Sequence, residues 1–181
     1  MPYIDLPQAI PGIRSLLTAF PETGEPLSAF TQQLLRGKSS LTAAERELIA
    51  ACVSEANECT FCTLSHTAVA EQLFPETDSH LVHKVVFEKE TSGLSEKMAA
   101  LIDLALAVQK GGSSVTPTHI GKARAAGADD KAIHDTVLIA AAFCMFNRYV
   151  DGLATRTPEE ESVYTEIGKN LASNGYNPAN R

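Results

Sequence analysis

The stretch 42–66, TAAERELIAACVSEANECTFCTLSH, decides how we expect this chain to fold. Thr42 and Glu45, three residues apart, form a capping box, so a helix is expected to begin here with its apolar residues at helical spacing. The polar residues at 57–58 interrupt that spacing, which predicts a short turn where this helix ends. A second helix is expected over 59–74, ahead of a proline that cannot continue it.

Two cysteines in the first turn of this second helix, Cys59 and Cys62, are separated by two residues, and His66 follows four residues later. The exposed N–H groups and the positive dipole end at a helix start favour a thiolate over a thiol. On a continuing helix, His66 shares a face with Cys62 and can accept its proton. The spacing predicts a redox site.

The sequence leaves the roles within this site open. A thiolate could attack a peroxide O–O bond, the second cysteine could close a disulfide, and a dithiol donor could restore the pair. Contact with His66 favours Cys62 as the attacking sulfur, whereas the helix dipole favours Cys59. Glu47 or Glu55 could orient the imidazole or take its proton through water. Half of a zinc site is the alternative, but it needs a fourth ligand such as Glu55.

The rest of the chain also reads as helices, and no stretch alternates as a strand would. We expect them at 11–20, 26–36, 78–88, 95–110, 117–126, 130–153 and 157–172, before a polar tail at 173–181. The last of these is predicted from Thr157 as N-cap, Pro158 in the first turn and Glu160 as the capping-box acid.

The predicted fold class is all-α, a helical bundle formed by a single domain over 1–181. The redox motif lies in an N-terminal half, at about 42–74, and a C-terminal half at 94–153 lacks a cysteine pair. The patterns at 42–57 and 129–147 are alike, so two similar halves around one core are an option.

Composition and charge exclude several classes of partner and location. The 181 residues are 44% hydrophobic and carry a net charge of −7 without a basic cluster, which argues against a nucleic-acid partner. The longest apolar run, 137–146, is about half of a bilayer crossing, so we expect a buried helix and no membrane partner. Four cysteines are too few for a secreted disulfide scaffold, and residues 1–20 lack a signal-peptide pattern, so a cytoplasmic location is expected.

A family resemblance rests on four residues. Glu47, Cys59, Cys62 and His66 are separated by eleven, two and three residues, and this series resembles the core of the AhpD-like alkylhydroperoxidases. These belong to the carboxymuconolactone decarboxylase superfamily. The segment 94–152 is similar to the two-segment "peroxidase-related" branch of that group.

The resemblance implies an all-α homo-oligomer that reduces organic hydroperoxides or a partner disulfide with a dithiol or protein reductant, without a metal, haem or other cofactor. It assigns the redox pair to Cys59 and Cys62 and the proton relay to His66 and Glu47. Phe61 stands where some members carry a second histidine between the cysteines, which affects proton delivery and donor choice. A dimer, trimer or hexamer is compatible with the sequence.

Two other functions remain compatible with these residues. One is a non-enzymatic dithiol sensor or partner protein, which would be oxidised once without turnover. The other is a carboxymuconolactone decarboxylase-like enzyme, because superfamily decarboxylases share the fold without the cysteine pair. Such an activity would leave both cysteines dispensable.

Structural roles are expected for the other reactive residue types. Cys52 and Cys144 lie in apolar runs and are expected to be buried. The remaining histidines lack a placed carboxylate partner and are expected at the surface or at helix caps: His80, His83, His119 and His134. An apolar stripe is predicted to be core or subunit interface: Leu101, Leu104, Ala105 and Val108.

Overall fold

The computed structural model describes residues 1–177, and its regular elements within that range are all helical, as predicted. The α-helices are α1 (Ile13–Ala19), α2 (Pro21–Arg36), α3 (Ala43–Ala56), α4 (Thr60–Leu73), α5 (Ser79–His83), α6 (Glu96–Lys110), α7 (Pro117–Ala125), α8 (Asp130–Gly152) and α9 (Glu161–Asn174). A π-helical turn (Lys84–Glu88) continues α5, and a 3-10 turn (Gly112–Ser114) follows α6.

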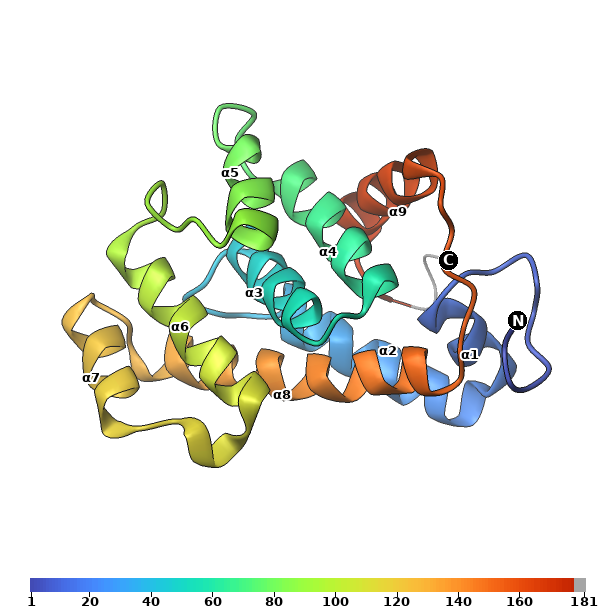
Figure 1. The fold of residues 1–181 in the computed structure, drawn as a ribbon, viewed down its shortest axis with the longest axis horizontal. Coiled ribbons are helices and arrows are strands. Elements are labelled where there is room, and N and C mark those ends of the chain that lie inside the picture. Colours follow the sequence, from blue (N-terminus) through green and yellow to red (C-terminus); the bar gives the residue numbers. More distant parts are fainter. Residues whose placement is uncertain (178–181) are drawn as a thin grey trace.

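The helices pack around α3, which contacts α4, α6 and α8 (Figure 1). Helix α8 runs along the length of the molecule with α2 behind it, and α4 lies between α3 and α9. The main core fills the space around α3, α6 and α8 and includes the whole predicted stripe of α6. A smaller apolar cluster, which includes both cysteines of the predicted redox pair, forms where α4 and α9 meet.

The capping box that starts α3 is present as predicted. The Thr42 backbone N–H donates to Glu45 Oε2 at 2.7 Å, and the Glu45 backbone N–H donates to Thr42 Oγ1 at 3.2 Å. The predicted turn after α3 contains Glu58 with a left-handed φ of 61°. Cys59 then caps α4, and its backbone N–H donates to the Ser54 carbonyl oxygen at 3.0 Å. Local sequence signals therefore place the cysteine pair at a helix start.

Two predicted helix starts were wrong. Helix α2 begins at Pro21 instead of Pro26, because the Gly24 N–H already donates to the Phe20 carbonyl at 2.8 Å. Gly24 also packs so closely on α1 that a Cβ would lie 2.2 Å from the Leu17 carbonyl oxygen. Contact between the two helices therefore sets this boundary.

Helix α9 begins at Glu161, four residues after the predicted N-cap Thr157. The buried Tyr164 hydroxyl donates to the Pro158 carbonyl oxygen at 2.8 Å, and this tertiary contact holds the preceding segment outside the helix. Glu160 is the N-cap residue and makes no side-chain capping bond.

The prediction of a polar tail at 173–181 was also wrong in part. Ser173 and Asn174 still belong to α9, and Tyr176 is only 8% exposed. The last four residues of the predicted tail, 178–181, lie outside the described range. The chain after α9 therefore returns to the interior.

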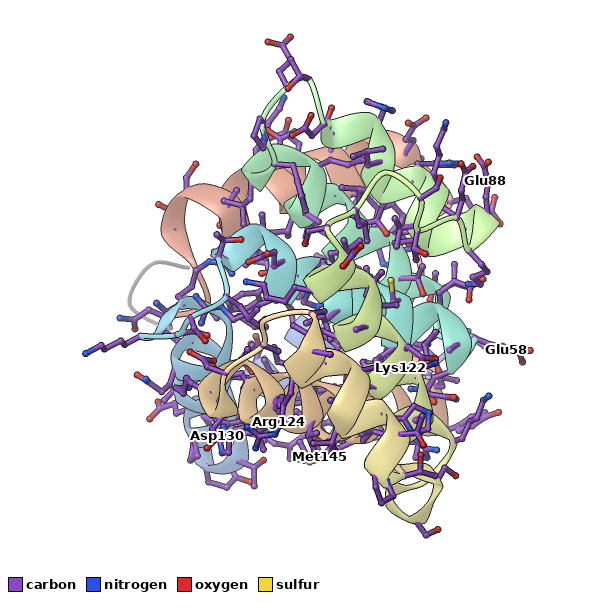
Figure 2. All side chains as sticks on the ribbon, turned by 90° about the vertical axis from the view of Figure 1, so that its left-hand side faces the viewer. Glu58, Glu88, Lys122, Arg124, Asp130 and Met145 are labelled. Atoms are coloured by element: carbon purple, nitrogen blue, oxygen red, sulfur yellow. The ribbon has the colours of Figure 1, made fainter. Side chains whose placement is uncertain are left out.

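The apolar run 137–146 forms a helix as predicted, but it is not buried on all sides. Phe143 and Phe146 face the core, whereas Met145 is 46% exposed and points outward on the face shown in Figure 2. Among the described helices, none is both long enough and apolar enough to cross a membrane.

Candidate active site

The cysteine pair is buried at the start of α4. Cys59 is 0% and Cys62 is 3% exposed, and both are free thiols. A hydrogen bond between the two side chains, together with burial, raises the pKa of the Cys59 thiol. Cys59 therefore holds its proton more tightly than an ordinary thiol.

His66 lies one turn after Cys62 on α4 and contacts the acid that the sequence placed in the site. Its Nδ1 is 2.6 Å from Oε2 of Glu47, which is completely buried on α3. The structure thus brings three elements of the prediction together: the cysteine pair, the histidine and Glu47. Glu55 instead pairs with Lys89 Nζ at 2.6 Å.

Glu47 has two further partners that sequence reasoning did not find. Nη1 of Arg36, the last residue of α2, lies 2.6 Å from Glu47 Oε1. The hydroxyl of Tyr176, which follows α9, donates to the same oxygen at 2.7 Å. The Arg36 guanidinium lies 5.1 Å from the centre of the Tyr176 ring, which stacks on His66 at 16°.

These contacts fix the protonation of the site. Burial alone raises the pKa of Glu47, but the charge and hydrogen bond of His66, the Arg36 cation and the Tyr176 hydroxyl outweigh it and lower the pKa below its ordinary value. Burial and the Glu47 charge hold the pKa of Tyr176 well above 10, so the phenol remains a donor. The Glu47 carboxylate only accepts, so Nδ1–H of His66 donates to it and, in the neutral ring, Nε2 is the acceptor nitrogen.

A polar network supports the turn that carries Cys59. Ser54 accepts the Cys59 backbone N–H with its carbonyl, and its hydroxyl accepts from Asn147 Nδ2 of α8 at 3.0 Å. Asn57 in the turn donates to Asn147 Oδ1 at 2.8 Å. Cys144, predicted to be buried, is half-buried beside this network, with its sulfur 3.5 Å from the Asn57 amide. Helix α8 thus braces the start of α4.

An apolar cavity of about 110 Å³ opens beside His66. Its wall includes Cys62 and His66 but not Cys59. Most of the remaining wall is apolar and comes from α1, α2, α8 and α9: Ile13, Leu17, Leu27, Phe143, Phe146 and Ile167. A small apolar molecule in this cavity would meet Cys62 and His66 together.

The zinc site that the sequence left as an alternative lacks a complete set of ligands in the described part of the chain. Residues 1–177 contain no group of three or more His, Cys, Asp or Glu side chains placed to share an ion. Glu55, the fourth zinc ligand considered from the sequence, is engaged by Lys89.

Solved structures of similar proteins share this arrangement of helices. An uncharacterised peroxidase-related protein from Silicibacter sp. TM1040 is 25% identical with a TM-score of 0.74, over 83% of this chain and 78% of that one. An uncharacterised peroxidase-related protein from Ralstonia eutropha JMP134, described as an alkylhydroperoxidase AhpD core, is 24% identical with a TM-score of 0.76, over 88% and 82%.

A third structure is a protein of unknown function from Agrobacterium tumefaciens, proposed to be the antioxidant defence protein AhpD. It is 21% identical with a TM-score of 0.68, over 80% of this chain and 97% of that one. No curated protein matches the sequence. The model of the carboxymuconolactone decarboxylase family matches residues 21–73 and 74–155. Because this match spans more than half of the chain, the all-helical protein belongs to the carboxymuconolactone decarboxylase family.

Proposed function

We propose that this protein is a thiol-dependent peroxidase that reduces small organic hydroperoxides at Cys62. The observation that carries the proposal is the shared cavity wall of Cys62 and His66, backed by a second cysteine that the cavity does not reach. An enclosed apolar cavity suits a small organic peroxide better than the exposed disulfide of a protein partner.

The first step is transfer of the Cys62 proton to Nε2 of His66, while Glu47 holds the other ring nitrogen and balances the imidazolium. The thiolate then attacks the terminal peroxide oxygen, the O–O bond breaks, and Cys62 becomes a sulfenic acid. The alkoxide leaves with the proton from His66 as an alcohol. Glu47 acts here as a fixed anion that orients His66, because its own pKa is lowered.

The second step uses Cys59. Its thiol condenses with the sulfenic acid of Cys62, which forms the intrachain disulfide and releases water. A dithiol donor then reduces this disulfide by two exchange reactions and becomes a disulfide itself. In total, one hydroperoxide and one dithiol give one alcohol, one water and one disulfide.

Turnover of cumene hydroperoxide with dithiothreitol tests the proposal. We expect sustained consumption by the wild type and none by Cys62→Ser. Cys59→Ser should form one sulfenic acid per chain and lose fast turnover. The matched control is Cys144→Ser, which changes a half-buried cysteine outside the cavity and should behave as the wild type.

Three outcomes would contradict the assignment in different ways. Sulfenic acid in Cys62→Ser instead of Cys59→Ser would exchange the roles of the two sulfurs. A single stoichiometric oxidation of the wild type without turnover would favour a dithiol sensor. Activity that survives loss of both cysteines would remove the thiol mechanism.

A further inference from the structure

The mouth of the apolar cavity is polar. Of the cavity-wall residues in the described part of the chain, Arg14 on α1 and Asn170 on α9 are the two that are exposed, and all others are buried or half-buried. Arg14 and Asn170 therefore mark where the cavity meets solvent. Apart from His66, Arg14 is the one wall residue among residues 1–177 with a side chain that can carry positive charge.

Neither mouth residue is engaged by the protein. Within residues 1–177, the side chains of Arg14 and Asn170 make no hydrogen bond or ion pair, whereas Arg36 forms an ion pair with Glu47. A guanidinium and an amide can both donate N–H groups to one carboxylate. In a chain with a net charge of −7, an unpaired cation at a cavity mouth is a local attraction for an anion.

A third unengaged polar group lies in the wall of the same cavity. Ser65 is 3% exposed, and its hydroxyl has no hydrogen-bond partner in the described structure. It immediately precedes His66 on α4. A buried hydroxyl without a partner is costly, and a bound oxygen atom would remove that cost.

We propose that the cavity selects apolar hydroperoxides that carry a carboxylate at the end opposite the peroxide. Arg14 and Asn170 bind the carboxylate at the mouth, and Ser65 donates to a peroxide oxygen beside Cys62. This inference rests on the proposed peroxidase function and names the substrate class of that same site.

The size of the cavity limits the body between the two ends. An engineered cavity of about 150 Å³ holds one benzene ring, so about 110 Å³ accommodates an aryl ring only in part or a short branched alkyl group. The carboxylate then extends toward the mouth. The chemistry at sulfur is unchanged: the peroxide gives an alcohol that keeps its carboxylate, and the dithiol donor supplies two electrons and two protons.

The test compares cumene hydroperoxide with its para-carboxylate, which has the same reacting group and one added anion. With dithiothreitol as donor, we expect the wild type to prefer the carboxylate by about tenfold in kcat/KM, mainly through KM. Arg14→Gln should abolish this preference, so that the ratio of kcat/KM for the two peroxides falls to about one. Arg124→Gln is the control, because it removes the same charge from the exposed face in Figure 2, outside the cavity wall.

Ser65→Ala tests the inner contact. Loss of the hydroxyl should lower kcat/KM severalfold for both peroxides alike, because both carry the same peroxide group. Thr67→Val is its control, since Thr67 also has a buried hydroxyl without a partner but is not in the cavity wall. Equal effects of the two substitutions on turnover would show that Ser65 acts only through stability.

Binding of the para-carboxylated alcohol product separates the two proposals, because it does not require turnover. An Arg14-dependent Kd without any peroxide reduction would support the carboxylate site and contradict the peroxidase function. Reduction of cumene hydroperoxide without a preference for the carboxylate, or with a preference that survives Arg14→Gln, would overturn the substrate class and leave the peroxidase function intact.

Discussion

Replacement of Tyr176 by phenylalanine should lower the free energy of unfolding most near neutral pH and progressively less in acid. The substitution keeps the ring that stacks on His66 and removes the hydroxyl that donates to Glu47 at 2.7 Å. A hydrogen bond to a charged acceptor contributes about 1.5–3 kcal/mol, which corresponds to about one to two pKa units. Arg36 and His66 still hold the carboxylate, so we expect the lower value, about one unit.

The direction follows from the lowered pKa of Glu47. A carboxylate with a lower pKa in the folded chain adds stability above its unfolded pKa and loses it as the pH falls through its folded pKa. Loss of the Tyr176 hydroxyl raises the folded pKa toward the unfolded pKa, so the carboxylate adds less stability above its unfolded pKa. The free energy of unfolding near neutral pH should therefore fall by about 1–2 kcal/mol. This difference from the wild type should narrow as the pH falls, because protonation of Glu47 removes the contribution from both proteins.

Urea unfolding at a series of pH values between about 3 and 7 measures the free energy of unfolding and its pH dependence. The loss of peroxide turnover in acid should shift to higher pH together with the pKa of Glu47. Tyr164→Phe is the matched control, because it removes another buried hydroxyl whose acceptor, a backbone carbonyl, is uncharged. It should lower stability by about 1 kcal/mol at all of these pH values. The same pH dependence in both variants would refute the account of Glu47.

Further predictions concern the cysteine pair, the relay, the fold and the assembly. Mild oxidation should link Cys59 to Cys62 within one chain, and mass spectrometry of a peptide that spans both would detect any other pairing. His66→Ala should slow alkylation of the cysteine pair by iodoacetamide at neutral pH but not well above a pH of about 8.5. Identical rates of the variant and the wild type at every pH would exclude His66 as the base. Gly12→Ala should lower the free energy of unfolding by more than about 2 kcal/mol, because Gly12 has a φ of 58° and a Cβ would lie 2.0 Å from the Phe61 ring. Light scattering should show a homo-oligomer, and a monomer at micromolar concentration would contradict that expectation.

The features that could be predicted from the sequence depend on residues that are neighbours along the chain. The capping box of Thr42 and Glu45 and the turn before Cys59 involve neighbouring residues, so their sequence signals sufficed. The i, i+4 spacing likewise placed His66 one turn beyond Cys62.

The missed residues depend on contacts between distant segments. Tyr176 and Glu47 are 129 residues apart, and no periodicity connects them. The one sign of its role in the sequence is that Tyr176 is an aromatic residue within an otherwise polar segment. Arg36 followed by a glycine is typical of a helix C-terminus, where the helix dipole favours a positive charge. Its pairing with Glu47 could therefore not be predicted from its position. The start of α9 failed for the same reason, because it depends on the contact of Tyr164 with Pro158.

The ion pair of Arg36 with Glu47 determines the net charge of the site during the proposed cycle. The two side chains cancel each other, so with a neutral His66 and two thiols the buried group is electrically neutral. Transfer of the Cys62 proton to His66 creates a cation and an anion together, and the sum remains zero. The disulfide is also neutral. At no stage does the group of Arg36, Glu47, His66 and the two cysteines carry a net charge, so neither oxidation nor reduction requires an ion from solvent to enter beside them.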